Sequence, residues 1–148
     1  LNPDHDTILE IAAIATDPSL HYIVEGPSLI INQSHATINN ISEEVTALFK
    51  KSNLLKDALQ STISLQDAED QILEFIANTC TNTFHLAGNS IYVDRSFIKR
   101  FMPRLDKAAH YRMIDVSTIK LIVSEWFANN QTSEFTKKKN HRALDDIK

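Results

Sequence analysis

The chain is poor in the residues that build several common kinds of functional site. It contains only two glycines, Gly26 and Gly88, so it offers no glycine-rich loop of the kind that cradles nucleotide phosphates. A single cysteine, Cys80, excludes an internal disulfide and a zinc site built from a cysteine cluster. No apolar run approaches the roughly 20 residues that span a bilayer. These absences favour a protein of a reducing, intracellular compartment with no membrane partner.

Length and charge are those of one ordinary domain. With 148 residues the chain can bury a hydrophobic core, and we expect a single domain over residues 1–148. The formal net charge of −4 argues against a large surface for duplex nucleic acid, since such surfaces are rich in phosphate-neutralising lysine and arginine. A very short nucleic acid has few phosphates and is compatible with this charge.

Apolar periodicity predicts an α/β domain with a mixed sheet and crossover helices. The expected strands cover residues 8–16, 22–25, 28–31, 84–87 and 111–114. The expected helices cover residues 41–59, 94–101 and 117–127, one that begins at the capping-type sequence 64–67, and one after residue 141. Gly26-Pro27 is interpreted as a break between two strands, and residues 128–140 as a polar loop. The inward side chains of the helix at 117–127 are expected to be Ile119, Ile122, Val123 and Trp126.

The last residues combine a base with a carboxylate. His141 is followed by Asp146, five positions later. A neutral imidazole can take a proton from water, and a carboxylate can hold a divalent cation. Five positions on a regular helix correspond to about 140° of rotation, so the two side chains could not share one helix face. We therefore expect His141 to lie in the loop before the final helix.

Three segments together resemble the oligoribonuclease family, which belongs to the DEDDh group of 3′-to-5′ exonucleases and degrades very short RNAs. They are residues 88–94 (GNSIYVD), 110–118 (HYRMIDVST) and 141–146 (HRALDD), in this order and spacing. The segments at residues 25–27 and 101–103 also fit the family. The resemblance covers nearly the whole chain.

The resemblance implies an RNase H-like mixed sheet flanked by helices and a two-metal reaction. In the family, four carboxylates surround two divalent ions, Mg²⁺ or Mn²⁺, and a histidine is the general base. By this resemblance Asp94 is the third carboxylate, Asp146 is the fourth, and His141 is the base. Asp145 is then a neighbour of the ligand. Such ions prefer oxygen ligands and can lower the pKa of the attacking water.

The resemblance also implies how a short single-stranded RNA is held. The family binds the end of its substrate with a polar cap and contacts the bases with an apolar wedge. Residues that match the cap are Ser90, Arg112, Ser117 and Thr118, and residues that match the wedge are Leu1 and Tyr111. An arginine can clamp a phosphate, and free N–H groups at a helix start favour an anion. In the family the tyrosine and the cap come from the partner subunit of a homodimer.

Two departures from the family pattern are visible. The first two carboxylates of the family lie in an Asp-x-Glu string immediately before the position of Leu1, on the first and central strand of the sheet. We therefore expect residues 1–148 to be a fragment, partial at both ends, lacking that strand and inactive by itself. The family also usually has a tryptophan and two histidines where this chain has Glu44, Leu48 and Phe49, which bears on substrate affinity. The parent protein is expected in the cytoplasm or the mitochondrion.

Other interpretations stay open. Asp94 alone could be a solvated acid at a helix start, Arg112 could pair with Asp115, and Tyr111 could be a core aromatic, as we expect for Trp126. Two other functions also fit the chain. One is a DEDDh exonuclease that acts on longer RNA or DNA ends. The other is a catalytically dead relative that dimerises or binds short RNA.

Overall fold

The strands of this chain form two separate pairs in the part that the structure describes. The computed structural model describes residues 1–49, 52–126 and 142–147. β1 (Glu10–Thr16) pairs antiparallel with β2 (Ile23–Ile30), and β3 (Leu86–Gly88) pairs in parallel with β4 (Met113–Asp115). The two small sheets and their flanking helices make a mixed α/β arrangement, as expected for an RNase H-like exonuclease.

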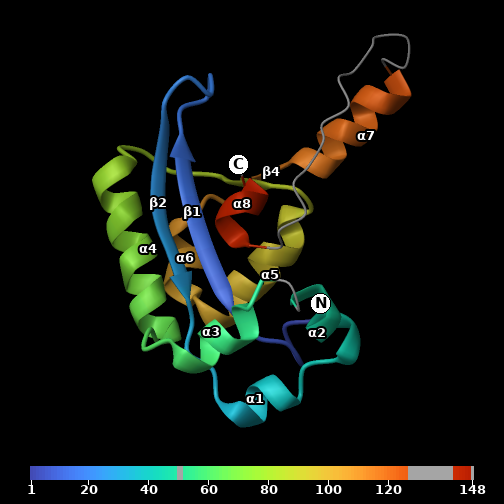
Figure 1. The fold of residues 1–148 in the computed structure, drawn as a ribbon. Coiled ribbons are helices and arrows are strands. Elements are labelled where there is room, and N and C mark those ends of the chain that lie inside the picture. Colours follow the sequence, from blue (N-terminus) through green and yellow to red (C-terminus); the bar gives the residue numbers. More distant parts are fainter. Residues whose placement is uncertain (50–51, 127–141, 148) are drawn as a thin grey trace.

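Helices surround both strand pairs (Figure 1). Within the described residues they are α1 (His35–Asn39), α2 (Glu43–Phe49), α3 (Leu54–Gln60), α4 (Leu65–Thr79), α5 (Ile91–Phe101), α6 (Pro103–Ala108), α7 (Val116–Trp126) and α8 (Ala143–Ile147). α4 packs along β2, α8 lies beside β1, and α7 points away from the body (Figure 1). None of the described helices is both long enough and apolar enough to cross a membrane.

The main core lies between the β1–β2 pair and the helices α4, α5 and α6. Its fully buried members include Ile31 and Met102, and Ile72 of α4 is 2% exposed. The start of α4 is fixed by a capping box, in which the Ser64 hydroxyl accepts from the Asp67 N–H and the Asp67 carboxylate accepts from the Ser64 N–H. This confirms the helix start predicted at residues 64–67. The core therefore holds α5, which carries Asp94, against the sheet.

The predicted break between two strands at Gly26-Pro27 is wrong, because β2 runs through both residues. Pro27 has no N–H, but β2 has only β1 as its partner among the described strands, so a missing donor is tolerated there. The register shifts between Ala12 and Ile14 of β1, opposite this segment, which absorbs the irregularity. Gly26 lies under the ring of Phe75, where a Cβ atom would come within 2.6 Å of that ring.

Several helix boundaries also differ from the predictions. The stretch 41–59 contains two helices, α2 and α3, instead of one, and Asn53 at the start of α3 has a left-handed backbone with a φ of 54°. α1 and α6 were not predicted at all. α6 begins at Pro103, which suits the first position of a helix because that position needs no N–H donor. The expected loop at 128–140 lies outside the described residues.

The inward face predicted for α7 is only partly confirmed. Ile122 and Val123 are half-buried, whereas Ile119 is 49% exposed and Trp126, expected in the core, is 73% exposed. α7 contacts β3, but the helix points away from the body of the molecule (Figure 1). The periodicity correctly predicted a helix with an apolar stripe, and it wrongly predicted that the whole stripe packs within the same chain.

Candidate active site

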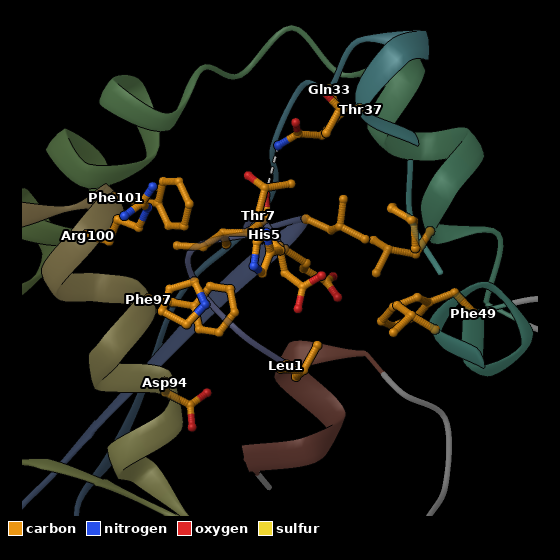
Figure 2. Close-up of a pocket in the computed structure, with 18 of the residues that line it drawn as sticks. Leu1, His5, Thr7, Gln33, Thr37, Phe49, Asp94, Phe97, Arg100 and Phe101 are labelled. Atoms are coloured by element: carbon orange, nitrogen blue, oxygen red, sulfur yellow. Dashed lines mark hydrogen bonds between the residues drawn. The ribbon is translucent and has the colours of Figure 1, made fainter. Parts of the chain in front are cut away.

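A cavity of about 720 Å³ lies where the N-terminal segment, α1, α2, α5 and α8 meet. Three residues of the predicted site line it, namely Leu1, Asp94 and Asp146. Figure 2 shows the side chain of Asp94 projecting from α5 toward α8. The fold thus brings together side chains from three segments that are far apart in the sequence.

Asp94 occupies the first turn of α5, directly after the turn at residues 88–90. Ser90 precedes the helix with a left-handed backbone at a φ of 54°, and its C=O accepts from the Val93 N–H. A carboxylate in the first helical turn is favoured by the helix dipole. The Asp94 carboxyl opens to the cavity, yet the surrounding walls withhold part of its hydration, and this desolvation raises its pKa above the usual value.

Asp146 belongs to α8, which is fastened to β1 by an arginine. The Arg142 Nε and Nη2 atoms donate to Glu10 Oε1 at 3.0 and 2.8 Å, and the Ala143 N–H donates to Glu10 Oε2 at 2.9 Å. The Asp146 N–H in turn bonds to the Arg142 C=O at 3.0 Å. The side chain of Asp146 therefore reaches the cavity from a helix whose first residue is held by the sheet.

Other acidic residues line the same cavity and are held by partners within the protein. Asp4 pairs with Arg100 at 2.8 Å, Asp6 accepts from the Asn2 N–H at 2.7 Å, and Glu10 binds Arg142. Asp94 forms no ion pair with the other described residues, and burial disfavours its charged form. A cation bound in the cavity would stabilise the charged form of these carboxylates.

The predicted cap forms a second group of residues, outside the lining of the cavity. Asp115 Oδ1 accepts from the Ser90 N–H at 3.0 Å and from both the Ser117 N–H and hydroxyl, at 2.9 and 2.5 Å. The Ser117 hydroxyl is the main cause of the lowered pKa of Asp115. Ser90 and Ser117 are thus brought together, and Thr118 is exposed next to them at the start of α7.

Tyr111 and Arg112 lie on the surface, and the interpretation that Arg112 pairs with Asp115 finds no support. The guanidinium of Arg112 sits 5.3 Å from the centre of the Tyr111 ring, and Tyr111 is 69% exposed, so it is no core residue. Arg95 fixes the backbone of this segment, because its Nη1 donates to the His110 and Tyr111 C=O groups at 2.8 and 2.9 Å. The stacked pair is therefore presented to solvent on a supported loop.

Comparison with known proteins identifies the family. The sequence pattern of an exonuclease family matches residues 1–148. A probable oligoribonuclease of Caenorhabditis elegans is 40% identical over 148 residues, which cover 99% of this chain and 76% of the relative. The chain belongs to the oligoribonuclease branch of the exonuclease family. The oligoribonuclease of Corynebacterium diphtheriae is 43% identical over 149 residues, covering 99% of this chain and 71% of that protein.

A human protein with an oligoribonuclease name is also similar to this chain. The protein named mitochondrial oligoribonuclease of Homo sapiens is 41% identical over 150 residues, covering 99% of this chain and 62% of its own length. Exonucleases of this family generally use divalent metal ions. The resemblance that the motifs at 88–94, 110–118 and 141–146 indicated is thereby confirmed at the level of the family.

The donor set suits a hard divalent cation, although the described residues form only part of a site. Asp94 and Asp146 offer carboxylate oxygens, the ligand type that Mg²⁺ and Mn²⁺ prefer. Among the described residues, no three His, Cys, Asp or Glu side chains lie close enough together to hold a metal. His141 lies outside the described residues, as do the side chains of Glu44 and Leu48, whereas Phe49 lines the cavity.

The sequence did not reveal two residues that organise these groups. Glu10 resembled an ordinary polar position in the strand at 8–16, and its partner Arg142 stands 132 positions away. Asp115 was considered only as a partner of Arg112. The signal that could have found it is the spacing of Asp115 and Ser117, because an aspartate commonly accepts from the N–H two residues on.

Proposed function

We propose that this protein is a 3′-to-5′ exoribonuclease that hydrolyses oligoribonucleotides of two to a few nucleotides to 5′-mononucleotides. The observation that carries the proposal is the match to oligoribonucleases over 99% of the chain. The cavity supports it, because it collects Leu1, Asp94 and Asp146, three residues that match family site positions.

Asp94 and Asp146 are the residues that we propose as ligands of Mg²⁺ or Mn²⁺. When bound, such ions polarise the phosphodiester and favour hydroxide formation from water. His141 is proposed as the base that takes the proton of the attacking water. The raised pKa of Asp94 supports its part, since the fold desolvates a carboxylate at the cavity wall, where a cation would offset the cost of its charge.

Leu1 and Tyr111 are proposed to contact the bases, and the cap of Ser90, Arg112, Ser117 and Thr118 to bind the terminal phosphate. The Ser117 N–H and hydroxyl donate to Asp115, whereas the side chain of Thr118 is exposed beside them and its hydroxyl can donate to a phosphate. The guanidinium of Arg112 is exposed and can donate to two phosphate oxygens at once. A cap that binds the end of the substrate leaves little room for a longer chain, so dinucleotides are preferred.

The cap is proposed to serve the cavity of a second copy, in a homodimer. Its residues are absent from the lining of the cavity in their own chain. Next to them lies an apolar surface on β4 and α7, in which Leu121 is 61% and Trp126 is 73% exposed. Its large side chains are Met113, Ile114, Ile119, Leu121 and Trp126. Apolar patches of this kind mark protein–protein interfaces.

The site of action is proposed to be the cytoplasm or the mitochondrion. One relative is named as mitochondrial in human, and another comes from the bacterium Corynebacterium diphtheriae. Expression of the full-length protein with a fluorescent tag, beside markers of both compartments, distinguishes the two.

Competition between two substrates tests the proposed activity. The full-length protein is incubated with Mn²⁺, a ribodinucleotide and a long single-stranded RNA, and release of mononucleotides from each is followed. We expect the dinucleotide to be consumed first. Preferential use of the long RNA would favour an exonuclease acting on longer ends, and binding without cleavage would favour a non-catalytic relative.

A further inference from the structure

Glu10 is a buried carboxylate at the end of the cavity whose oxygens are occupied by protein donors. Only 4% of its side chain is exposed. Oε1 accepts from Arg142 Nη2 at 2.8 Å and Nε at 3.0 Å, while Oε2 accepts from the Ala143 N–H at 2.9 Å and from Arg142 Nε at 3.2 Å. Although Glu10 lines the cavity, its oxygens are directed to α8 and not to a ligand.

This contact determines where α8 begins. α8 begins at Ala143, directly after Arg142, so the contact with Glu10 lies at the start of the helix. Glu10 satisfies one of the unpaired N–H groups at the helix start and places a negative charge at the positive end of the helix. The planar guanidinium of Arg142 adds a bidentate pair, which fixes orientation as well as distance. Asp57 Oδ2 of α3 lies 3.9 Å from Arg142 Nη1 and adds a weaker electrostatic contact to the same guanidinium.

The residues on either side of this contact are the ones assigned to catalysis. Asp146 lies one helical turn after Arg142, and its N–H bonds to the Arg142 C=O. His141 is the residue covalently joined to the Arg142 N atom. A rotation or shift at Arg142 is therefore transmitted through the helix backbone to Asp146.

We infer that Glu10 is a positioning residue, which through Arg142 holds Asp146 in register with Asp94 across the cavity. This inference rests on the proposed function for the roles of those two residues. Glu10 itself neither binds the metal nor transfers a proton. Its contribution is to set the geometry of α8, and reactions at bound phosphates are sensitive to displacements of the order of an ångström.

The chain contains a matched control for this contact. Glu69 of α4 is 4% exposed and accepts from the Arg104 N–H at 2.7 Å, Arg104 Nε at 2.8 Å and the Leu105 N–H at 3.0 Å. It thus fastens the start of a short helix, α6, through an arginine and a backbone N–H, as Glu10 does. Neither Glu69 nor Arg104 lines the cavity. Glu69→Gln therefore removes the same kind of buried contact away from the proposed site.

The test compares Glu10→Gln with Glu69→Gln in the full-length protein, after both are shown to fold by circular dichroism. We expect Glu10→Gln to lower kcat on a ribodinucleotide by about 100-fold, with KM within about threefold of wild type. Its equilibrium affinity for Mn²⁺ alone should fall by at least about tenfold, as for residues that orient a metal ligand. Glu69→Gln should leave both quantities within about twofold of wild type.

Arg142 separates a positioning role from direct metal binding. If Glu10 acts through Arg142, then Arg142→Gln lowers kcat as much as Glu10→Gln, the double variant is no worse than either, and Arg142→Lys restores part of the activity. Full Mn²⁺ affinity in Arg142→Gln combined with its loss in Glu10→Gln would make Glu10 a ligand and overturn the inference. Arg142→Gln leaves the buried Glu10 carboxylate without its cation, so the double variant, which removes both charges, is the one to compare with wild type if a single variant does not fold.

Failure of the proposed function gives a different result. If the wild-type protein does not cut dinucleotides, the proposed activity is wrong, and the Mn²⁺ affinities of the same variants still test the contact. Equal Mn²⁺ affinities in wild type, Glu10→Gln and Glu69→Gln, or no Mn²⁺ binding by wild type, overturn the positioning role.

Discussion

Asp94→Asn separates a catalytic carboxylate from a structural one. The Asp94 carboxyl lines the cavity, and desolvation raises its pKa. An aspartate whose pKa is raised in the folded state favours folding below its unfolded pKa of about 3.9, and this contribution is lost as the pH rises through the folded value. At neutral pH without metal, the ionised Asp94 therefore makes folding less favourable, and an asparagine of the same shape relieves this.

The expected effects on activity and on stability are opposite in direction. A metal ligand contributes several kcal/mol to transition-state stabilisation, and a loss of about 4 kcal/mol corresponds to about a 1,000-fold fall in kcat/KM. In EDTA at neutral pH, the free energy of unfolding of Asp94→Asn should equal or exceed that of wild type. This advantage should shrink as the pH falls through the raised pKa of Asp94 and should be gone below about 4.

Asp4→Asn is the control from the same cavity. The side chain of Asp4 is 68% exposed and forms a surface ion pair with Arg100, and such pairs contribute at most about 1 kcal/mol. Asp4→Asn should therefore keep its activity within about threefold of wild type. Urea unfolding in EDTA and initial rates on a ribodinucleotide give both quantities. Two results for Asp94→Asn would contradict its assignment as a metal ligand. One is a lower free energy of unfolding than wild type, and the other is an activity above about a tenth of the wild-type value.

Three further predictions concern the dimer, the pH dependence and the fold. Trp126→Ser should convert a dimer to monomers in sedimentation analysis and lower dinucleotide activity, while a dimer that persists would show that this apolar surface is not the interface. Burial, assisted by His85 and nearby arginines, lowers the pKa of His110. The unfolded state therefore binds a proton more readily, so stability should decrease as the pH falls from about 7 to 5, and His110→Asn should flatten this dependence in urea titrations. Gly26→Ala should lower the unfolding free energy by about 1–3 kcal/mol, because the new methyl group displaces the ring of Phe75; an unchanged thermal midpoint would argue against that contact.

Local signals in the sequence predicted the fold where neighbouring residues alone decide the structure. The capping box at residues 64–67 has its donors and acceptors within one turn, so this helix start could be predicted without tertiary information. Gly26-Pro27 was misinterpreted because the same pair breaks a central strand but is tolerated in β2, whose only partner in the described sheet is β1. Whether a strand is central is a property of the sheet and not of the segment.

The apolar stripe of α7 shows a second limit. Periodicity reports which side of a helix avoids water, and it does not say whether the covering surface belongs to the same chain. Trp126 was therefore placed in the core of its own chain, whereas it is exposed in the described structure. The proposed dimer gives this stripe a partner of identical sequence.

Only the residues of the candidate site that belong to the family motifs could be predicted from the sequence. Asp94, Asp146 and Leu1 were expected near one another from the family resemblance, and the fold brings them to one cavity. The contact of Glu10 with Arg142 could not be predicted, because a single acidic residue in an apolar strand resembles a solvated position. Only the tertiary structure reveals that this acid is buried and where its partner lies.

The order of products from a short RNA tests the central proposal most directly. A ribotrinucleotide labelled at its 5′ end is incubated with the full-length protein and Mn²⁺, and labelled products are resolved over time. A 3′-to-5′ exoribonuclease produces labelled dinucleotide first and labelled 5′-mononucleotide afterwards, and Asp94→Asn produces neither at a comparable rate. Immediate release of labelled mononucleotide, or an intact trinucleotide in the presence of metal, would contradict the proposed function.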